Sequence, residues 1–191
     1  MEKRNIEATR EALLNAAEKL MTECSDPSQV TSRAITKEAG VNLAMINYCF
    51  GSREALLFEV FGKLKTEAQL TDPEFGNIIK GEFSPKEKLI QIHLRTMTLM
   101  LRYFNYTKAL TKFVLLNREI AAERGSLSFI MAHFGKRKTE AECRLIAFEI
   151  SSLHELAVLR HEEIKAVCGI DLTDNAQLEN YIRNNINKFL D

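Results

Sequence analysis

Residues 42–48 carry the most distinctive chemistry in the chain, because this run combines hydrogen-bonding and apolar side chains without a single charge. We expect the run to form a short helix with Ile46 turned inward and Leu43 and Met45 facing outward. On such a face, a side-chain amide can pair with an adenine edge and an apolar side chain can meet a thymine methyl. The pattern therefore suits insertion into the major groove of double-stranded DNA.

A unit of three helices would hold this face in place. Apolar residues recur at helical spacing over residues 6–21, and Thr31 or Ser32 can cap a short second helix. Gly40 stands where that helix needs a left-handed residue to end, and Asn42 can cap the third helix. The expected inward face of the unit consists of Leu13, Leu14, Ala17, Val30, Ile35, Ala39, Val41, Ile46 and Phe50.

The remaining sequence predicts an all-α fold, with about nine helices in total. Residues 84–87 match a capping box and open a helix to about Phe104, which is apolar nearly all round and should be buried. A second capping box is expected at residues 174–177. Residues 71–83 show no strong periodicity of apolar residues, so we expect them to form a connection. The other expected helices lie near residues 53–70, 107–122, 126–134, 138–160 and 174–190.

The charge balance argues against strong electrostatic binding to nucleic acid. The chain has 26 Lys and Arg against 26 Asp and Glu, and its first 53 residues carry seven of each sign. DNA-binding proteins are usually basic. Any affinity for DNA must therefore come from the placement of charges, from helix N-termini and from dimerisation.

Other bulk features predict a cytoplasmic protein without a membrane segment. No apolar run approaches the roughly 20 residues that a membrane-spanning helix needs, and the N-terminus lacks the apolar core of a signal peptide. The four cysteines are far apart in the sequence and form no CxxC pair. We expect them to be reduced thiols.

Residues 31–57 resemble the helix-turn-helix of the TetR family of transcriptional regulators. Ile46 and Arg53 are conservative replacements, and Ile-Asn-Tyr-x-Phe at residues 46–50 is a recurring variant. Asn42, Ala44, Asn47 and Cys49 depart from the commonest family residues. The resemblance is carried by Thr31, Ile35, Ala39, Gly40, Val41, Phe50, Ser52, Glu54 and Leu56.

This resemblance implies a dimeric repressor that binds a palindromic operator. It implies a helix-turn-helix DNA-binding domain over residues 1–52 and an effector-binding and dimerisation domain over residues 53–191, with a connecting helix at about residues 53–70. Leu43, Ala44 and Asn47 would face base edges. The residues that would hold phosphates are Thr31, Asn42, Tyr48 and Arg53, and the amide ends of the helices that start near Ser32 and Asn42 would add contacts to phosphate. The residues implied in DNA binding are Thr31, Arg33, Asn42, Leu43, Ala44, Met45, Asn47, Tyr48 and Arg53.

The middle helices are rich in Met and Phe, which is typical of an ordinary core and also of an adaptable apolar cavity. In the TetR family the corresponding helices enclose an effector, so the resemblance implies a small hydrophobic or amphipathic ligand. His93 also fits a core histidine whose hydrogen bonds are satisfied. The candidate ligand-binding residues are His93, Met97, Met100, Phe104, Phe113, Asn117, Phe129 and His133.

Two apolar stripes, within residues 141–159 and 178–189, can pack inside one chain. The resemblance implies instead that these helices pair with their mates in a four-helix interface of a homodimer. The candidate interface residues are Leu145, Phe148, Ile150, Leu153, Leu156, Leu178, Ile182 and Ile186.

The sequence gives no support to catalysis, a cofactor or a metal site. It contains no Gly-rich phosphate loop, GxSxG elbow or HExxH motif. His154 and His161 lie two turns apart, which is not the compact spacing of paired metal ligands. An all-α enzyme would need a catalytic pair that we do not find, whereas a helix-turn-helix dimer controlled by a protein partner remains an open alternative.

Overall fold

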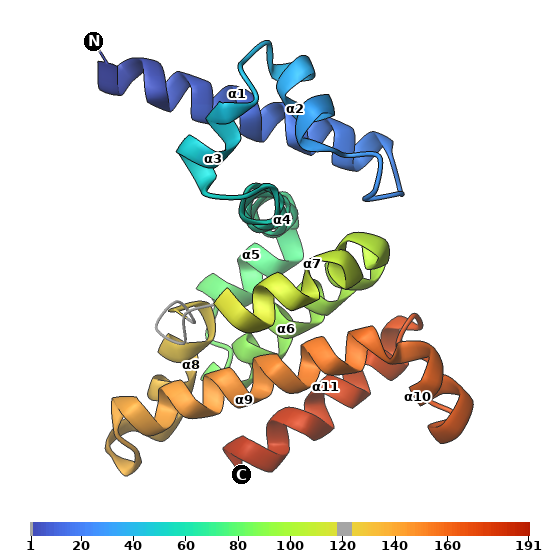
Figure 1. The fold of residues 1–191 in the computed structure, drawn as a ribbon. Coiled ribbons are helices and arrows are strands. Elements are labelled where there is room, and N and C mark those ends of the chain that lie inside the picture. The colour runs from blue at the N-terminus through green and yellow to red at the C-terminus, as the bar shows by residue number, and fades with distance from the viewer. Residues whose placement is uncertain (1, 118–123) are drawn as a thin grey trace. The chain divides into compact units, whose positions relative to one another are not determined.

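The computed structural model describes residues 2–117 and 124–191, with the side chains of residues 2–5 and 124 left aside. Every regular element in these ranges is helical, which confirms the all-α class (Figure 1). The elements are α1 (Glu2–Glu23), α2 (Ser32–Ala39), α3 (Ala44–Phe50), α4 (Arg53–Leu70), α5 (Pro73–Lys80), α6 (Pro85–Arg102), α7 (Phe104–Asn117), α8 (Arg124–Phe134), η2 (Gly135–Arg137), α9 (Glu140–Leu159), α10 (His161–Cys168) and α11 (Asn175–Leu190).

The described ranges contain eleven α-helices, so the expected number of about nine is too low. The segment expected to be a connection holds α5, where the Asp72 side chain accepts from the Phe75 amide and Pro73 occupies the first turn. The second addition is α10, which starts directly after α9 without a side-chain cap and ends at Gly169 in the left-handed region. The expected helix near residues 107–122 is seen as α7 up to Asn117, and residues 118–122 lie outside the described chain.

The chain divides into two compact units that do not follow the expected boundary near residue 52. The first unit combines residues 1–66 with residues 105–117, and therefore holds α1 to α3, most of α4, and α7. The second unit combines residues 67–104 with the described part of residues 118–191, and holds α5, α6 and α8 to α11. The functional division into a DNA-binding and an effector domain stays a prediction.

In the second unit, α6 is the central helix, as its composition indicates. It packs against α8, α9 and α11. Leu89, Ile90 and Met97 of α6 join one apolar cluster with residues from all three of these helices, and none of the three is more than 2% exposed. Burial of such side chains stabilises the fold by roughly 1.5–3 kcal/mol each.

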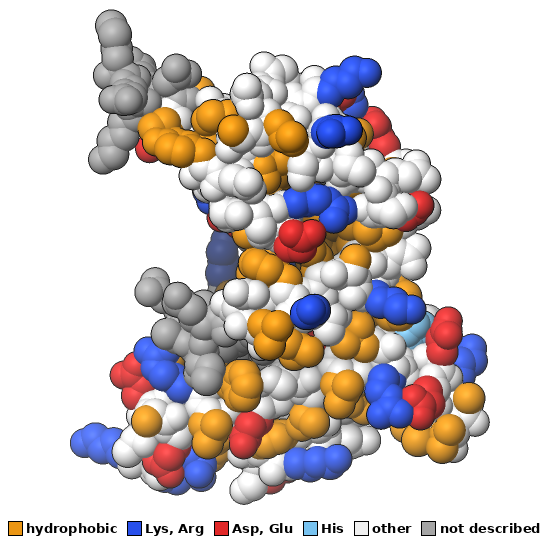
Figure 2. Space-filling model, viewed as in Figure 1, with side chains coloured by type: hydrophobic (Ala, Val, Ile, Leu, Met, Phe, Trp, Pro, Cys, Tyr) orange, Lys and Arg blue, Asp and Glu red, His pale blue; other side chains and the backbone are white. Residues whose placement is uncertain are grey.

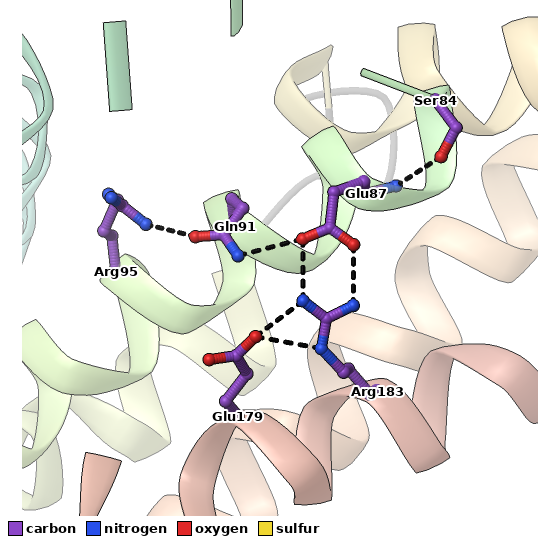
Figure 3. Close-up of polar contacts among 6 residues, drawn as sticks. All are labelled: Ser84, Glu87, Gln91, Arg95, Glu179 and Arg183. Atoms are coloured by element: carbon purple, nitrogen blue, oxygen red, sulfur yellow. Dashed lines mark hydrogen bonds and ion pairs between the residues drawn. The ribbon is translucent and has the colours of Figure 1, made fainter. Parts of the chain in front are cut away.

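A chain of polar contacts fastens α6 to its neighbours (Figure 3). Ser84 Oγ accepts from the Glu87 amide at 3.2 Å, but the Glu87 carboxylate does not complete the expected capping box. It accepts two bonds from Arg183 of α11 instead, at 2.6 and 2.8 Å. The Arg183 hydrogen bonds lower the pKa of Glu87. Arg95 continues the chain by donating to Gln91 at 2.5 Å and to Asp72 at 2.7 Å.

The second expected capping box also differs from the structure. Asp174 does accept from the Gln177 amide at 2.9 Å, but the Gln177 side chain accepts from the Asp171 amide. A full capping box occurs where none was expected, between Thr139 and Glu142 at the start of α9. The residue that caps a helix can be inferred from the sequence. The hydrogen-bond partner of the side chain three positions later cannot, because it depends on which other groups of the folded chain lie beside the helix start.

Two imidazoles meet inside the apolar core of the second unit. His93 Nδ1 of α6 lies 2.9 Å from His154 Nδ1 of α9, and His93 Nε2 lies 3.2 Å from Ser126 Oγ of α8. His93 is thus a satisfied core histidine. His154 is 2% exposed, and burial lowers its pKa to about 4. With this lowered pKa, the His154 imidazole is neutral at physiological pH.

Acidification should weaken the second unit through His154. Because the folded pKa is about 4 and the ordinary value is 6.5, the unfolded chain binds a proton between these values that the folded chain does not. The free energy of unfolding should therefore fall by about 2 kcal/mol from pH 6.5 to about pH 5. Denaturant unfolding followed by circular dichroism measures this loss.

The matched variant for this experiment is His154→Leu, which should lose much less stability over the same pH range. The carboxylates with lowered pKa values, such as Glu87, destabilise the fold only at lower pH. Equal pH dependence of the wild type and of His154→Leu above pH 5 would contradict the assignment to His154.

Candidate nucleic-acid interface

The helix-turn-helix consists of α2, a glycine turn and α3. Thr31 caps α2, because its Oγ1 accepts from the Ala34 amide at 3.1 Å. Gly40 ends this helix with a φ of 66°, a conformation that favours glycine. Asn42 Oδ1 then accepts from the Ala44 amide at 2.9 Å as α3 begins. The side chains of Thr31 and Asn42 thus occupy first-turn amides that were expected to bind phosphate.

Arg10 of α1 holds the far end of α3. Its guanidinium donates to the Cys49 carbonyl at 2.6 Å and lies 4.2 Å from the centre of the Phe50 ring. The same group forms an ion pair with Glu59 of α4. One side chain therefore joins α1, α3 and α4.

Arg53 fixes the loop that leads into α2, and this differs from its expected phosphate contact. Its Nε donates to the Val30 carbonyl at 2.6 Å, and another guanidinium nitrogen donates to the Pro27 carbonyl. Its third nitrogen lies 3.2 Å from Glu54. All three nitrogens have partners inside the unit, so Arg53 holds this loop, and its expected contact with a DNA phosphate stays a prediction.

Helix α7 belongs to the same unit and braces the same loop. The Tyr106 hydroxyl donates to the Cys24 carbonyl at 2.5 Å, and the Asn105 amide donates to the Ser25 carbonyl at 3.0 Å. Burial raises the pKa of Tyr106 to about 12. Farther along α7, the Phe113 ring lies 6.0 Å from the ring of Phe58 in α4. No local sequence signal connects α7 with residues so far away in the chain.

The outward face of α3 matches the expectation from sequence at Leu43 and Tyr48 but only in part at Met45. Leu43 is 47% exposed and Tyr48 is 67% exposed, whereas Ile46 is 2% exposed. Met45 is half-buried. The other DNA-binding candidates apart from Arg53 are exposed, and they are Thr31, Arg33, Asn42, Ala44 and Asn47.

The candidate ligand-binding residues are divided between the two units. Met97 lies in the core cluster of the second unit, and Met100, Phe104 and Phe129 pack against that cluster. His133, on α8, packs edge-on against Phe134 with ring centres 4.9 Å apart. The two remaining candidates, Phe113 and Asn117, belong to the first unit. The side chain of Asn117 donates to the Phe113 carbonyl of its own helix at 2.9 Å.

The candidate dimer-interface residues separate into two groups. Leu145, Leu153 and Leu156 are 42–54% exposed along α9, and Figure 2 shows apolar side chains at the surface where Figure 1 draws this helix. Phe148 is half-buried. The other four need correction, because they are at most 1% exposed and form the core within one chain. They are Ile150, Leu178, Ile182 and Ile186.

No helix in the described ranges is long and apolar enough to cross a membrane. Among the same residues, no group of three or more His, Cys, Asp or Glu side chains could hold a metal ion. The four cysteines are free thiols.

A capped helix, a glycine turn and a second short helix with an exposed uncharged face define a helix-turn-helix protein. Residues 13–60 match the family model described as bacterial regulatory proteins, tetR family. The expected resemblance of the helix-turn-helix to this family is thereby confirmed for these residues.

A solved structure shows the same fold. A TetR transcriptional regulator from Rhodococcus sp. RHA1 superposes with a TM-score of 0.67 at 17% identity, covering 100% of this chain and 98% of that chain. A TetR-like transcriptional regulator from the same organism has a TM-score of 0.45 at 15% identity, covering 95% of each chain. No curated protein sequence matches this chain.

Arg53→Met should destabilise the first unit. The substitution leaves the carbonyls of Pro27 and Val30 without their charged donor, and loss of hydrogen bonds to a charged group costs about 2 kcal/mol. Denaturant unfolding would measure this, with the exposed Arg33→Met as control. Unchanged stability of Arg53→Met together with weaker DNA binding would contradict this structural role and would support the expected phosphate contact.

Proposed function

We propose that the protein is a transcriptional repressor that binds a palindromic operator as a homodimer and is released by a small hydrophobic or amphipathic effector. The observation that carries the DNA-binding part is the exposed face of α3, which is uncharged although its apolar Leu43 is 47% exposed. A solvated helix face normally carries charged residues. An exposed face of this composition suits the major groove, where base edges offer both hydrogen bonds and methyl groups.

Dimerisation is supported by the apolar stripe on α9. Leu145, Leu153 and Leu156 follow a helical spacing of eight and three residues, so they lie on one side of the helix. All three are exposed in the single chain. A two-fold axis would bring the stripe against its own copy. Dimers of this kind can place two recognition helices about 34 Å apart, one turn of DNA.

An effector site is supported by the chemistry of the core of the second unit. Met100, Phe104 and Phe129 pack against the core beside α6, and Met and aromatic side chains can repack around a ligand. The same unit buries the polar pair of His93 and His154. His154 Nε2 finds no hydrogen-bond partner among the described residues, so a polar group of an amphipathic molecule could pair with it.

Release from DNA requires that the effector favours a form of the protein that cannot bind the operator. A hundredfold loss of DNA affinity corresponds to about 2.7 kcal/mol of coupling. The chain offers covalent paths for this coupling, since α4 crosses the boundary between the two units and α7 directly follows α6. If no compound of a broad apolar panel shifts the melting temperature or releases DNA, control by a protein partner becomes the better hypothesis.

DNA binding by α3 is tested with Tyr48 and Asn47 variants in an electrophoretic shift assay. Tyr48→Ala should weaken binding about tenfold on every DNA sequence, because a phosphate contact carries no base information. Asn47→Ala should also change which bases are preferred. Tyr48→Phe is the matched control for the hydroxyl. Full affinity of the Tyr48→Ala and Asn47→Ala double variant would exclude α3 as the recognition helix.

The dimer interface is tested with Leu153→Glu and Leu156→Glu. Two negative charges brought together across a two-fold axis without partners should oppose association, and the variants should sediment as monomers at micromolar concentration. Val167→Glu is the control, since Val167 is an exposed apolar residue of α10. A wild type that sediments as a monomer, or Leu153→Glu and Leu156→Glu variants that remain dimers, would contradict the interface.

A further inference from the structure

The side chains that most often read guanine and cytosine are missing from the exposed face of α3. Guanine is commonly read by Arg or Lys, and cytosine by Asp or Glu. Residues 42–52 contain none of these four types. Arg10, which contacts the end of α3, and Arg53 both donate to main-chain carbonyls within the unit. The hydrogen bonds that discriminate G·C pairs therefore have no charged donor or acceptor on this helix.

The remaining polar groups of α3 further restrict the bases that this helix can recognise. Asn42 turns its Oδ1 back to the Ala44 amide. Asn47 is exposed, and its side chain forms no hydrogen bond within the described part of the chain. A free side-chain amide is the partner that fits the N6 and N7 atoms of adenine. Among the exposed residues of α3, Asn47 is thus the group with the chemistry for an adenine contact.

The apolar residues supply the complementary contact. Leu43 is 47% exposed at the start of α3, and the exposed Ala44 follows it. The feature of a base pair that an aliphatic side chain can recognise in the major groove is the C5 methyl of thymine. The exposed start of a recognition helix is the part that approaches base edges.

From these groups we infer that α3 specifies A·T base pairs, with Leu43 on a thymine methyl and Asn47 on an adenine. This inference rests on the proposed function and deepens it, because it states which bases the operator must contain beneath α3. Sequence preference then comes from methyl and amide contacts, and the neutral net charge of the chain does not oppose it.

The first experiment selects DNA from a random pool with the full-length protein. We expect two half-sites in inverted orientation, each with A·T pairs at the positions protected by α3. Each thymine is then replaced singly by uracil, which keeps the base pairing and removes only the methyl. At one position in each half-site, the replacement should weaken binding about fourfold, the factor expected for one buried methyl.

The Leu43→Ala variant tests whether Leu43 is the side chain that contacts this thymine methyl. The variant should retain the wild-type melting temperature, because Leu43 is exposed, and it should bind thymine and uracil operators with nearly equal affinity. Val167→Ala is the control for removing an exposed apolar side chain and should remain as sensitive to uracil as the wild type.

Three results would overturn the inference while leaving the proposed function intact. These are an operator with G·C pairs beneath α3, wild-type binding that is insensitive to every uracil replacement, and a Leu43→Ala variant that keeps full sensitivity to uracil. If no specific sequence is selected from the pool, the proposed function itself fails.

Discussion

A helix of seven residues cannot persist in water by itself, and the DNA-binding part of the structure depends on overcoming this constraint. Forming the first helical turn is unfavourable, and a short helix has too few further hydrogen bonds to offset it. Helix α3 is held by the buried Ile46, by Asn42 at its start and by Arg10 at its end. Because Ile46 and Arg10 hold the helix without using Leu43, Asn47 or Tyr48, these exposed side chains remain available for contacts with DNA.

Two arginines form hydrogen bonds within the first unit, and these bonds explain how a chain without net charge can still have an ordered DNA-recognition surface. Arg10 and Arg53 each donate to main-chain carbonyls, so their charge stabilises loop and helix ends. A guanidinium is suited to this because several donors share one rigid plane. Cations that remain exposed on α2, such as Arg33 and Lys37, are few. Affinity must then depend on shape, on base contacts and on two copies acting together.

The sequence predicts local features well and distant partners poorly. Thr31 and Gly40 were predictable as the start and end of α2, since caps and left-handed turns depend on one residue and its neighbours. The same locality explains why the all-α class could be predicted. The role of Arg53 could not, because its acceptors are carbonyls, which every residue carries. Tyr106 lies 82 residues from its acceptor Cys24, and an aromatic residue in a helix does not indicate its partner.

The apolar stripes of α9 and α11 show a second limit of prediction from sequence. On α11 the stripe that includes Ile182 is buried within one chain, whereas α9 carries a buried side and an exposed one. Helical periodicity identifies an apolar face but not the surface that covers it. Only the packing of α6, α9 and α11 distinguishes Ile150 from Leu153, which are neighbours on the same helix.

The first unit is discontinuous in sequence, and this affects the order in which the protein can fold. On the ribosome, α1 to α4 emerge well before α7. The carbonyls of Cys24 and Ser25 therefore lack their hydrogen-bond donors, Tyr106 and Asn105, until α7 has been synthesised. Residues 67–104 then form a closed loop between the two parts, and the entropy cost of closing such a loop rises only slowly with length. The compact unit that contains the helix-turn-helix consequently does not end with α4. Grafted onto another regulator, the helix-turn-helix would have to carry α7 with it or find a substitute helix in its new host.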